Sequence, residues 1–209
     1  MFAVLCLAVA IPASASTVYD NGGINGTESA WTINFGYAVS DSFTLSSSTT
    51  LTGAQIGLWA FPGDRPTTVD WSIGTYADDS SLGSGTAGLT NTFQYTNGYG
   101  YDILESTFSL SGTLGAGTYW FTLQNAVVPN GDPIYWDINQ GPSSAWESSY
   151  GYLDNNGQDC ANAIGYSGTC SDSFQIYGNP STTPEPASLL LMGSGLLMFG
   201  GYVRRKIAR

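Results

Sequence analysis

Residues 31–39 read WTINFGYAV, and large apolar side chains alternate there with small or polar ones. The large members are Trp31, Ile33, Phe35, Tyr37 and Val39. A period of two is typical of a β-strand that buries one face and leaves the other in water. Residues 69–73 (VDWSI) and the pair Phe174 and Ile176 repeat the pattern. The sequence therefore predicts an all-β protein.

Short runs rich in β-branched and aromatic residues recur between turn signals, as in sandwiches and barrels. They span residues 31–39, 41–45, 50–61, 68–76, 103–110, 117–127, 133–138 and 173–177. Turns are indicated at Asn97-Gly98, at Asn130-Gly131 and at the glycines of residues 112–117. Apolar residues with helical spacing are missing between these runs. We therefore predict one β-sandwich of jelly-roll type over residues 16–178.

Charge is distributed very unevenly. The 209 residues include 16 acidic and 5 basic residues and no histidine, for a net charge of −11. Residues 16–183 hold 15 of the acids (16 minus Glu185) and only Arg65 among the bases, a net of −14. So acidic a body repels nucleic acid. Without His or Lys in this body, nucleophiles paired with His, His-ligated zinc, Schiff bases and P-loops are excluded.

The N-terminal segment has the features of a secretory signal peptide. Residues 2–11 are apolar, Pro12 ends the run, and Ala13-Ser14-Ala15 follows as a cleavage site. We expect residues 1–15 to be removed after Ala15. No basic residue precedes the apolar run, which leaves the true start codon open, and a buried strand or helix is the alternative interpretation.

The C-terminal segment predicts a membrane span. After a polar linker at residues 179–183 come Pro184-Glu185-Pro186 and an uncharged run of 17 residues, 187–203. That length is at the lower limit for a transmembrane helix, about 17–25 residues. The basic tail after residue 203 favours a cytoplasmic C-terminus. The body at residues 16–178 is then exported.

Together these elements resemble the PEP-CTERM sorting signal of Gram-negative bacteria. The matching residues are Pro184, Glu185, Pro186, Arg204, Arg205 and Lys206, with the apolar run between them. The resemblance implies recognition by an exosortase, a membrane processing enzyme associated with exopolysaccharide. It also implies cleavage near the motif and delivery to the cell surface or extracellular matrix. It covers residues 184–209 and implies no activity for the body. A permanent membrane anchor is the alternative.

Two further features concern the region before the last strand. Cys160 and Cys170 are the cysteines left after removal of Cys6 with the signal peptide, and export favours a disulfide between them over two free thiols. The loop DNNGQD at residues 154–159 offers oxygen ligands for calcium through Asp154, Asn156 and Asp159. An ordinary Asx-rich turn explains the same residues. Apart from calcium we expect no cofactor.

Aromatic residues suggest a sugar-binding surface. Trp136, Trp146, Tyr150 and Tyr152 gather in a stretch rich in glycine and serine, where rings could stack on sugars. Burial in the core is the alternative, which we expect for the tryptophans on strand patterns, namely Trp31, Trp59, Trp71 and Trp120.

Three classes of function follow. We expect a non-enzymatic surface or matrix protein, with a carbohydrate-binding module as the alternative. A glycan-cleaving enzyme would need a pair of carboxylates. No spacing marks such a pair, so no catalytic residue is assigned.

Overall fold

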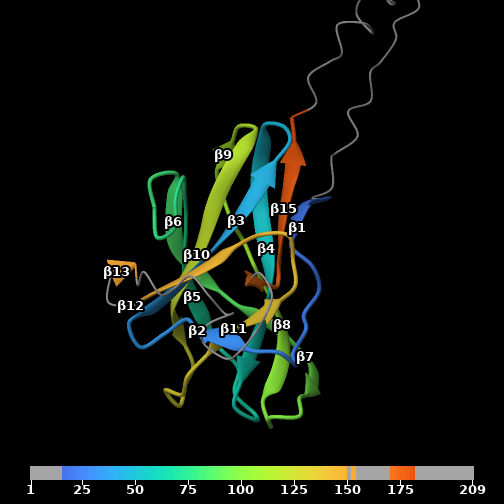
Figure 1. Ribbon diagram of the computed structural model, residues 1–209, viewed down its shortest axis with the longest axis vertical. Helices are drawn as coiled ribbons and strands as arrows, with labels where there is room; N and C mark the ends of the chain where they lie inside the picture. The colour runs from blue at the N-terminus through green and yellow to red at the C-terminus, as the bar shows by residue number, and fades with distance from the viewer. Residues whose placement is uncertain (1–15, 150–151, 154–169, 182–209) are drawn as a thin grey trace, which may run out of the picture.

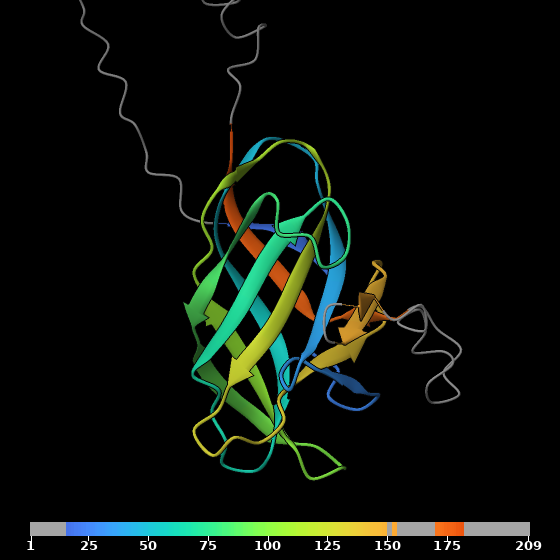
Figure 2. The same ribbon diagram turned by 90° about the vertical axis from the view of Figure 1, so that its left-hand side faces the viewer.

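The computed structural model describes residues 16–149, 152–153 and 170–181. Within these residues the regular structure is β-strand alone and every strand pairing is antiparallel, which confirms the all-β prediction. The strands form two sheets around one core (Figure 1). The second view shows the long strands of the sheets crossing the body obliquely (Figure 2).

The larger sheet has nine strands in the described residues, with β4 at its centre. They are β1 (Ser16–Asp20), β2 (Ala30–Thr32), β4 (Thr49–Ala60), β7 (Thr90–Thr96), β8 (Asp102–Phe108), β9 (Thr113–Leu114), β11 (Tyr135–Asn139), β14 (Ser171–Asp172) and β15 (Phe174–Pro180). The smaller sheet has six. They are β3 (Tyr37–Leu45), β5 (Thr68–Gly74), β6 (Gly83–Gly88), β10 (Gly117–Val127), β12 (Ala145–Ser149) and β13 (Tyr152–Leu153).

The core joins the two sheets through aromatic side chains. Phe121 of β10 lies with its ring centroid 5.7 Å from that of Phe174 in β15 and 5.8 Å from that of Trp136 in β11. All three are almost fully buried. Large rings bury much apolar area, and tilted contacts at these distances add to it. The alternation of VDWSI is confirmed, since Val69, Trp71 and Ile73 are buried in the same cluster, and so is that of Phe174 and Ile176.

The predicted single strand over residues 31–39 is wrong. β2 ends at Thr32 and β3 begins at Tyr37, because the chain turns between them. Phe35 (φ 56°) and Gly36 (φ 84°) adopt left-handed backbone, and Tyr37 N–H donates to Asn34 C=O at 3.1 Å. As a result Phe35 is 56% exposed although the alternation predicts burial. Residue 40, expected as a break, is instead inside the continuous β3.

Both ends of the described domain lie at the same end of the molecule. Ser16 pairs with Gly178 across β1 and β15, and Pro180 pairs with Thr49 at the start of β4 (Figure 1). β15 thus includes residues 179–180, which the sequence analysis assigns to the linker. Trp59 lies ten residues further along β4, or about 33 Å away in an extended strand. The two ends of β4 therefore mark opposite ends of the domain.

Candidate functional site

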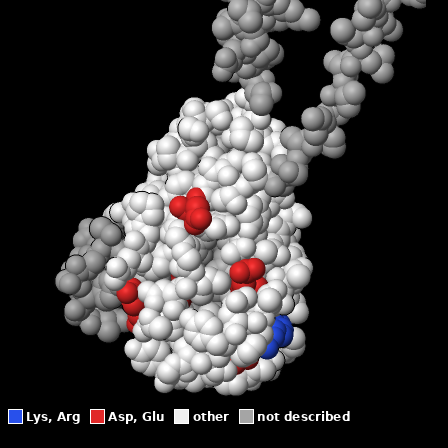
Figure 3. Space-filling model, turned by 90° about the vertical axis from the view of Figure 1, so that its right-hand side faces the viewer, with Lys and Arg blue, Asp and Glu red and all other residues white. Residues whose placement is uncertain are grey.

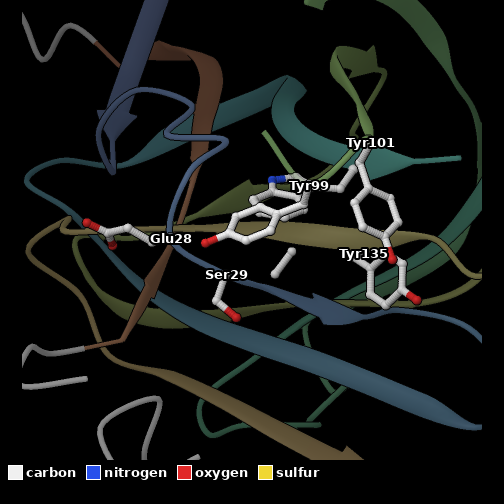
Figure 4. Close-up of a pocket in the computed structure, with 7 residues that line it drawn as sticks. Glu28, Ser29, Tyr99, Tyr101 and Tyr135 are labelled. Carbon is white, nitrogen blue, oxygen red and sulfur yellow. The ribbon is translucent and has the colours of Figure 1, made fainter. Parts of the chain in front are cut away.

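An aromatic pocket lies at the end of the domain far from Ser16 and Pro180. It has a volume of about 320 Å³, and the elements that line it are β4, β11, the β7–β8 loop and the segment that leads into β2 (Figure 4). The lining residues are Glu28, Ser29, Ala30, Trp59, Tyr99, Tyr101 and Tyr135. Small-ligand sites have volumes of about 300–1,000 Å³. The pocket is thus at the small end of that range.

The rings of this pocket contact one another and form a continuous wall. Trp59 and Tyr99 stack with centroids 5.9 Å apart and planes 22° apart. Tyr101 lies 5.8 Å from Trp59, and Tyr135 meets Tyr101 edge-on at 5.7 Å and 80°. Trp59 is buried, whereas Tyr99 is 66% exposed. A buried indole therefore supports an exposed phenol ring.

A buried carboxyl group fixes the tryptophan. Trp59 Nε1–H donates to Asp137 Oδ1 at 2.6 Å, and the N–H groups of Asn25 and Gly26 donate to the two oxygens of Asp137 at 2.7 Å. Burial raises the pKa of Asp137, while these hydrogen bonds act in the opposite direction. Asp137 thus ties Trp59 to the segment that carries Glu28 and Ser29.

The loop that carries Tyr99 and Tyr101 is closed by Asn97. Asn97 Oδ1 accepts from the N–H groups of both tyrosines at 3.0 Å, and Asn97 N–H donates to Tyr101 C=O at 2.8 Å. The turn predicted at Asn97-Gly98 is confirmed. Because the side-chain oxygen of Asn97 accepts from both amides, hydrogen bonds within the protein hold the loop in this conformation without a ligand. Tyr99 is therefore exposed on a preformed loop.

Residues 25–26, which precede Glu28 and Ser29 in the lining of the pocket, are hydrogen-bonded to β7 and to the β7–β8 loop. Tyr95 Oη–H donates to Asn25 C=O and Asn97 Nδ2–H to Gly26 C=O, both at 3.0 Å. Gly26 has φ 65°, and a Cβ at this position would collide with the Tyr95 hydroxyl. Only glycine combines a left-handed backbone with the absence of a Cβ atom at low energetic cost. The two walls of the pocket are thus held at a fixed separation.

A more polar hollow of about 420 Å³ adjoins the aromatic pocket. It is bordered by residues 22–25 and 139–141, and Glu28 lines both cavities. Gln140 Nε2–H donates to Glu28 Oε1 at 2.8 Å. Glu28 is the one carboxylic acid among the residues that line either cavity. The two cavities together therefore offer an aromatic surface beside a polar one that carries amide groups and a single carboxyl group.

A second group of polar residues is buried deeper in the domain. Asp41 Oδ2 accepts from Asn21 Nδ2–H at 2.9 Å and from Asp172 N–H at 2.7 Å. Burial raises the pKa of Asp41 to about 7 despite these hydrogen bonds. Burial, and next the charge of Asp41, raise the pKa of Asp172 well above its ordinary value. Neither carboxylate oxygen of Asp172 has a hydrogen-bond partner in the described part of the chain.

The structure places the predicted sugar-binding residues differently. Trp136 is fully buried, and its Nε1–H donates to Ser173 C=O at 3.0 Å, so it presents no ring to a ligand. Trp146 in β12 is half-buried. Tyr150 lies outside the described residues, and Tyr152 belongs to β13. Trp136 and Trp146 do not line the aromatic pocket.

The predicted metal and disulfide sites fall largely outside the described residues. Asp154, Asn156, Asp159 and Cys160 are not among them, and Cys170 is buried. Calcium binding and the disulfide therefore stay predictions. Within the described residues no three Asp, Glu, Cys or His side chains come together as a metal site.

Sequence reasoning missed the pocket because its parts are far apart in the chain. One signal was local: Tyr99 and Tyr101 flank Gly100 directly after the Asn97-Gly98 turn. Two large rings beside a tight turn have no strand face on which to be buried. The other two rings of the pocket, those of Trp59 and Tyr135, come together only through the pairing of β4 with β11.

Comparison with known families gives a match at the C-terminal segment. Residues 182–206 match the PEP-CTERM protein-sorting motif. No curated protein matches the chain in sequence. The motif begins two residues after the end of β15. Among the described residues no helix is long and apolar enough to cross the membrane, and the predicted span 187–203 lies outside them.

Proposed function

From the PEP-CTERM motif that ends this chain, which implies sorting by an exosortase toward the cell surface, we propose a non-enzymatic surface or matrix protein. In this proposal residues 1–15 direct export, and the body is a β-sandwich of jelly-roll type. A helix over 187–203 holds the chain in the membrane until an exosortase acts near Pro184-Glu185-Pro186. The body then remains in the exopolysaccharide matrix without a cofactor.

The observation that carries the proposal is the position of the motif. β15 ends at Pro180 and the match begins at residue 182. The chain therefore completes its last strand pairing, Pro180 with Thr49, before the motif starts. A motif placed there is accessible to a membrane enzyme without unfolding of the sheet. The sorting signal and the folded body can thus act independently.

A non-enzymatic role also agrees with the chemistry of the cavities. Hydrolysis of a glycosidic bond uses two carboxyl groups, about 5–9.5 Å apart. Glu28 alone supplies one among the described residues that line the two cavities. Asp137 lies behind Trp59, with hydrogen bonds from three protein donors. These cavities suit binding better than hydrolysis.

The test compares sorting of two matched variants in a Gram-negative host with and without its exosortase gene. One replaces Pro184, Glu185 and Pro186 by alanine, and the control replaces Ser181, which lies just outside the matched residues 182–206, by alanine. We expect wild-type and control protein on the cell surface with an intact mass that lacks residues 187–209. The motif variant, and wild-type protein without exosortase, should keep the tail in the membrane fraction. Surface delivery of tail-bearing protein in both hosts would contradict the proposal.

A further inference from the structure

The geometry points to a binding site for a neutral sugar unit in the aromatic pocket formed by Trp59, Tyr99, Tyr101 and Tyr135. The proposed function assigns the body no ligand, so this site goes beyond it. It stands on the described residues and does not depend on how the tail is processed. The ligand class is a neutral pyranose within an oligosaccharide or polysaccharide.

Tyr99 presents an exposed aromatic ring at the pocket. An aromatic side chain left 66% exposed loses the stability that burial would give it. Here the ring is also fixed, by stacking on Trp59 and by the Asn97 hydrogen bonds to its loop. A fixed exposed ring avoids the entropy cost of ordering on binding. The C–H groups on one face of a pyranose pack against such a ring and keep the hydroxyl groups at the edge.

The aromatic pocket also has a polar side. Glu28 and Ser29 also line the pocket, and Glu28 lies on the side away from Tyr101 and Tyr135 (Figure 4). The adjoining hollow continues past Glu28 along residues 139–141, where amide and backbone groups replace rings. Ligand sites combine apolar walls with a few polar groups that fix orientation. A sugar unit on the rings would direct its hydroxyls, and the next unit of the chain, toward the polar hollow.

The charge and the shape of the pocket disfavour other classes of ligand. Residues 16–183 carry a net charge of −14, and Glu28 adds a negative charge at the site itself, which disfavours uronic acids and sulfated sugars. Figure 3 shows one face of the body, with acidic side chains separated by broad uncharged surface. An aromatic cage for a quaternary ammonium group needs rings that face each other across the cation. Here the rings contact one another at 5.7–5.9 Å and form one wall.

The pocket lies at the end of the domain far from Pro180. The chain leaves the domain beside Thr49, whereas Trp59 is about 33 Å away along β4. A protein held through its C-terminal side therefore presents the pocket away from that attachment. A site in this place can reach polysaccharide around the cell while the tail is still held.

The test is a binding measurement on the full chain, in a polyoxyethylene detergent that has no sugar headgroup. The probes are an array of neutral oligosaccharides built from glucose, galactose, mannose and rhamnose, with titration calorimetry on any that bind. Oligogalacturonate and choline serve as anionic and cationic comparisons. We expect at least one neutral oligosaccharide to bind and to change tryptophan fluorescence, because Trp59 lines the site.

Three variants locate the site. Tyr99→Ala should weaken binding about tenfold or more, since removal of an aromatic ring that contacts the ligand is costly. Tyr99→Trp keeps a ring and should retain binding. Tyr76→Ala is the matched control, because Tyr76 is 62% exposed and does not line the pocket. Thermal unfolding confirms that all variants are folded.

Several results would overturn the proposal. One is that no oligosaccharide of the neutral array binds. Another is that only choline or oligogalacturonate binds, and a third is that Tyr99→Ala and wild type bind the neutral sugar with equal affinity. Surface delivery is measured separately with the alanine variants of residues 184–186. Loss of sugar binding with normal sorting would therefore leave the proposed function intact, and the reverse result would leave the sugar site intact.

Discussion

Because burial raises the pKa values of Asp41 and Asp172, we predict that the protein becomes less stable as pH rises from 5 to 8. Burial raises the pKa of Asp41 to about 7 from its ordinary value of 3.8. Between these two values the native state holds a proton that the unfolded state has released. A rise in pH therefore favours unfolding, and the stability that protonation supplies is lost as the pH passes through about 7. Asp172 acts in the same direction, because burial and the charge of Asp41 raise its pKa too.

The size of the effect follows from the pKa of Asp41. One unit of pKa difference corresponds to about 1.4 kcal/mol. With pKa values of about 7 and 3.8, Asp41 alone lowers the free energy of unfolding by roughly 2–3 kcal/mol between pH 5 and pH 8. Typical domains have only about 5–15 kcal/mol in total. The loss is therefore large enough to move a denaturation midpoint visibly.

Urea unfolding followed by tryptophan fluorescence at pH 5, 6, 7 and 8 measures this dependence. The informative variant is Asp172→Asn, which removes the second buried acid and with it the contribution of that acid to the pH dependence. We expect the decline in stability with pH to become clearly shallower. Asp20→Asn makes the same substitution at an exposed position and is the control that should keep the wild-type decline.

Two outcomes would refute this reasoning. One is a wild-type stability that stays level or rises from pH 5 to pH 8. The other is an Asp172→Asn variant that unfolds cooperatively with the same pH dependence as Asp20→Asn. The first would mean that the buried acids are ionised in the native state across this range, and the second would mean that Asp172 does not contribute to the pH dependence.

Three more predictions concern stability. Phe121→Ala should cost about 3–5 kcal/mol in urea unfolding, because the ring is fully buried between the sheets. Gly26→Ala should cost about 1–3 kcal/mol and loosen the pocket, because the new Cβ collides with the Tyr95 hydroxyl at positive φ; hydrogen exchange around Tyr95 would report the change. If Cys160 and Cys170 form the predicted disulfide, the double serine variant should lose roughly 2–3 kcal/mol relative to oxidised wild type, and reduction of wild type should give the same loss.

The sequence predicted those parts of the fold that depend on local alternation. Residues 69–73 show their buried face directly, because side chains on a strand point to opposite sides in turn. The same rule failed at residues 31–39, since two left-handed residues, Phe35 and Gly36, interrupt the strand without changing the apolar pattern. Several strands lie outside the predicted runs, among them β1, β6, β7 and β12. β6 is rich in glycine, and β7 is exposed along almost its whole length.

The pocket was beyond local reasoning because strand register creates it. Tyr135 pairs with Trp59, and Trp136 pairs with Leu58, across β11 and β4. Since neighbouring residues of a strand face opposite sides, Trp136 and Leu58 point into the core while Tyr135 and Trp59 line the pocket. Trp136, which the sequence pattern suggests as a sugar-binding ring, lies one residue from Tyr135. A period of two shows that adjacent residues differ in face, but only the pairing partners determine which face is buried.

This register also explains why the core and the pocket are coupled. Asp137 follows Trp136 in β11, yet it accepts the indole proton of Trp59 and the amide protons of Asn25 and Gly26. A shift of β11 by one residue would expose Trp136, and it would also withdraw the carboxylate that holds Trp59 in place. Burial of Trp136 in the aromatic core resists that shift. The core tryptophan, although it contacts no ligand site, therefore fixes the register on which the exposed rings depend.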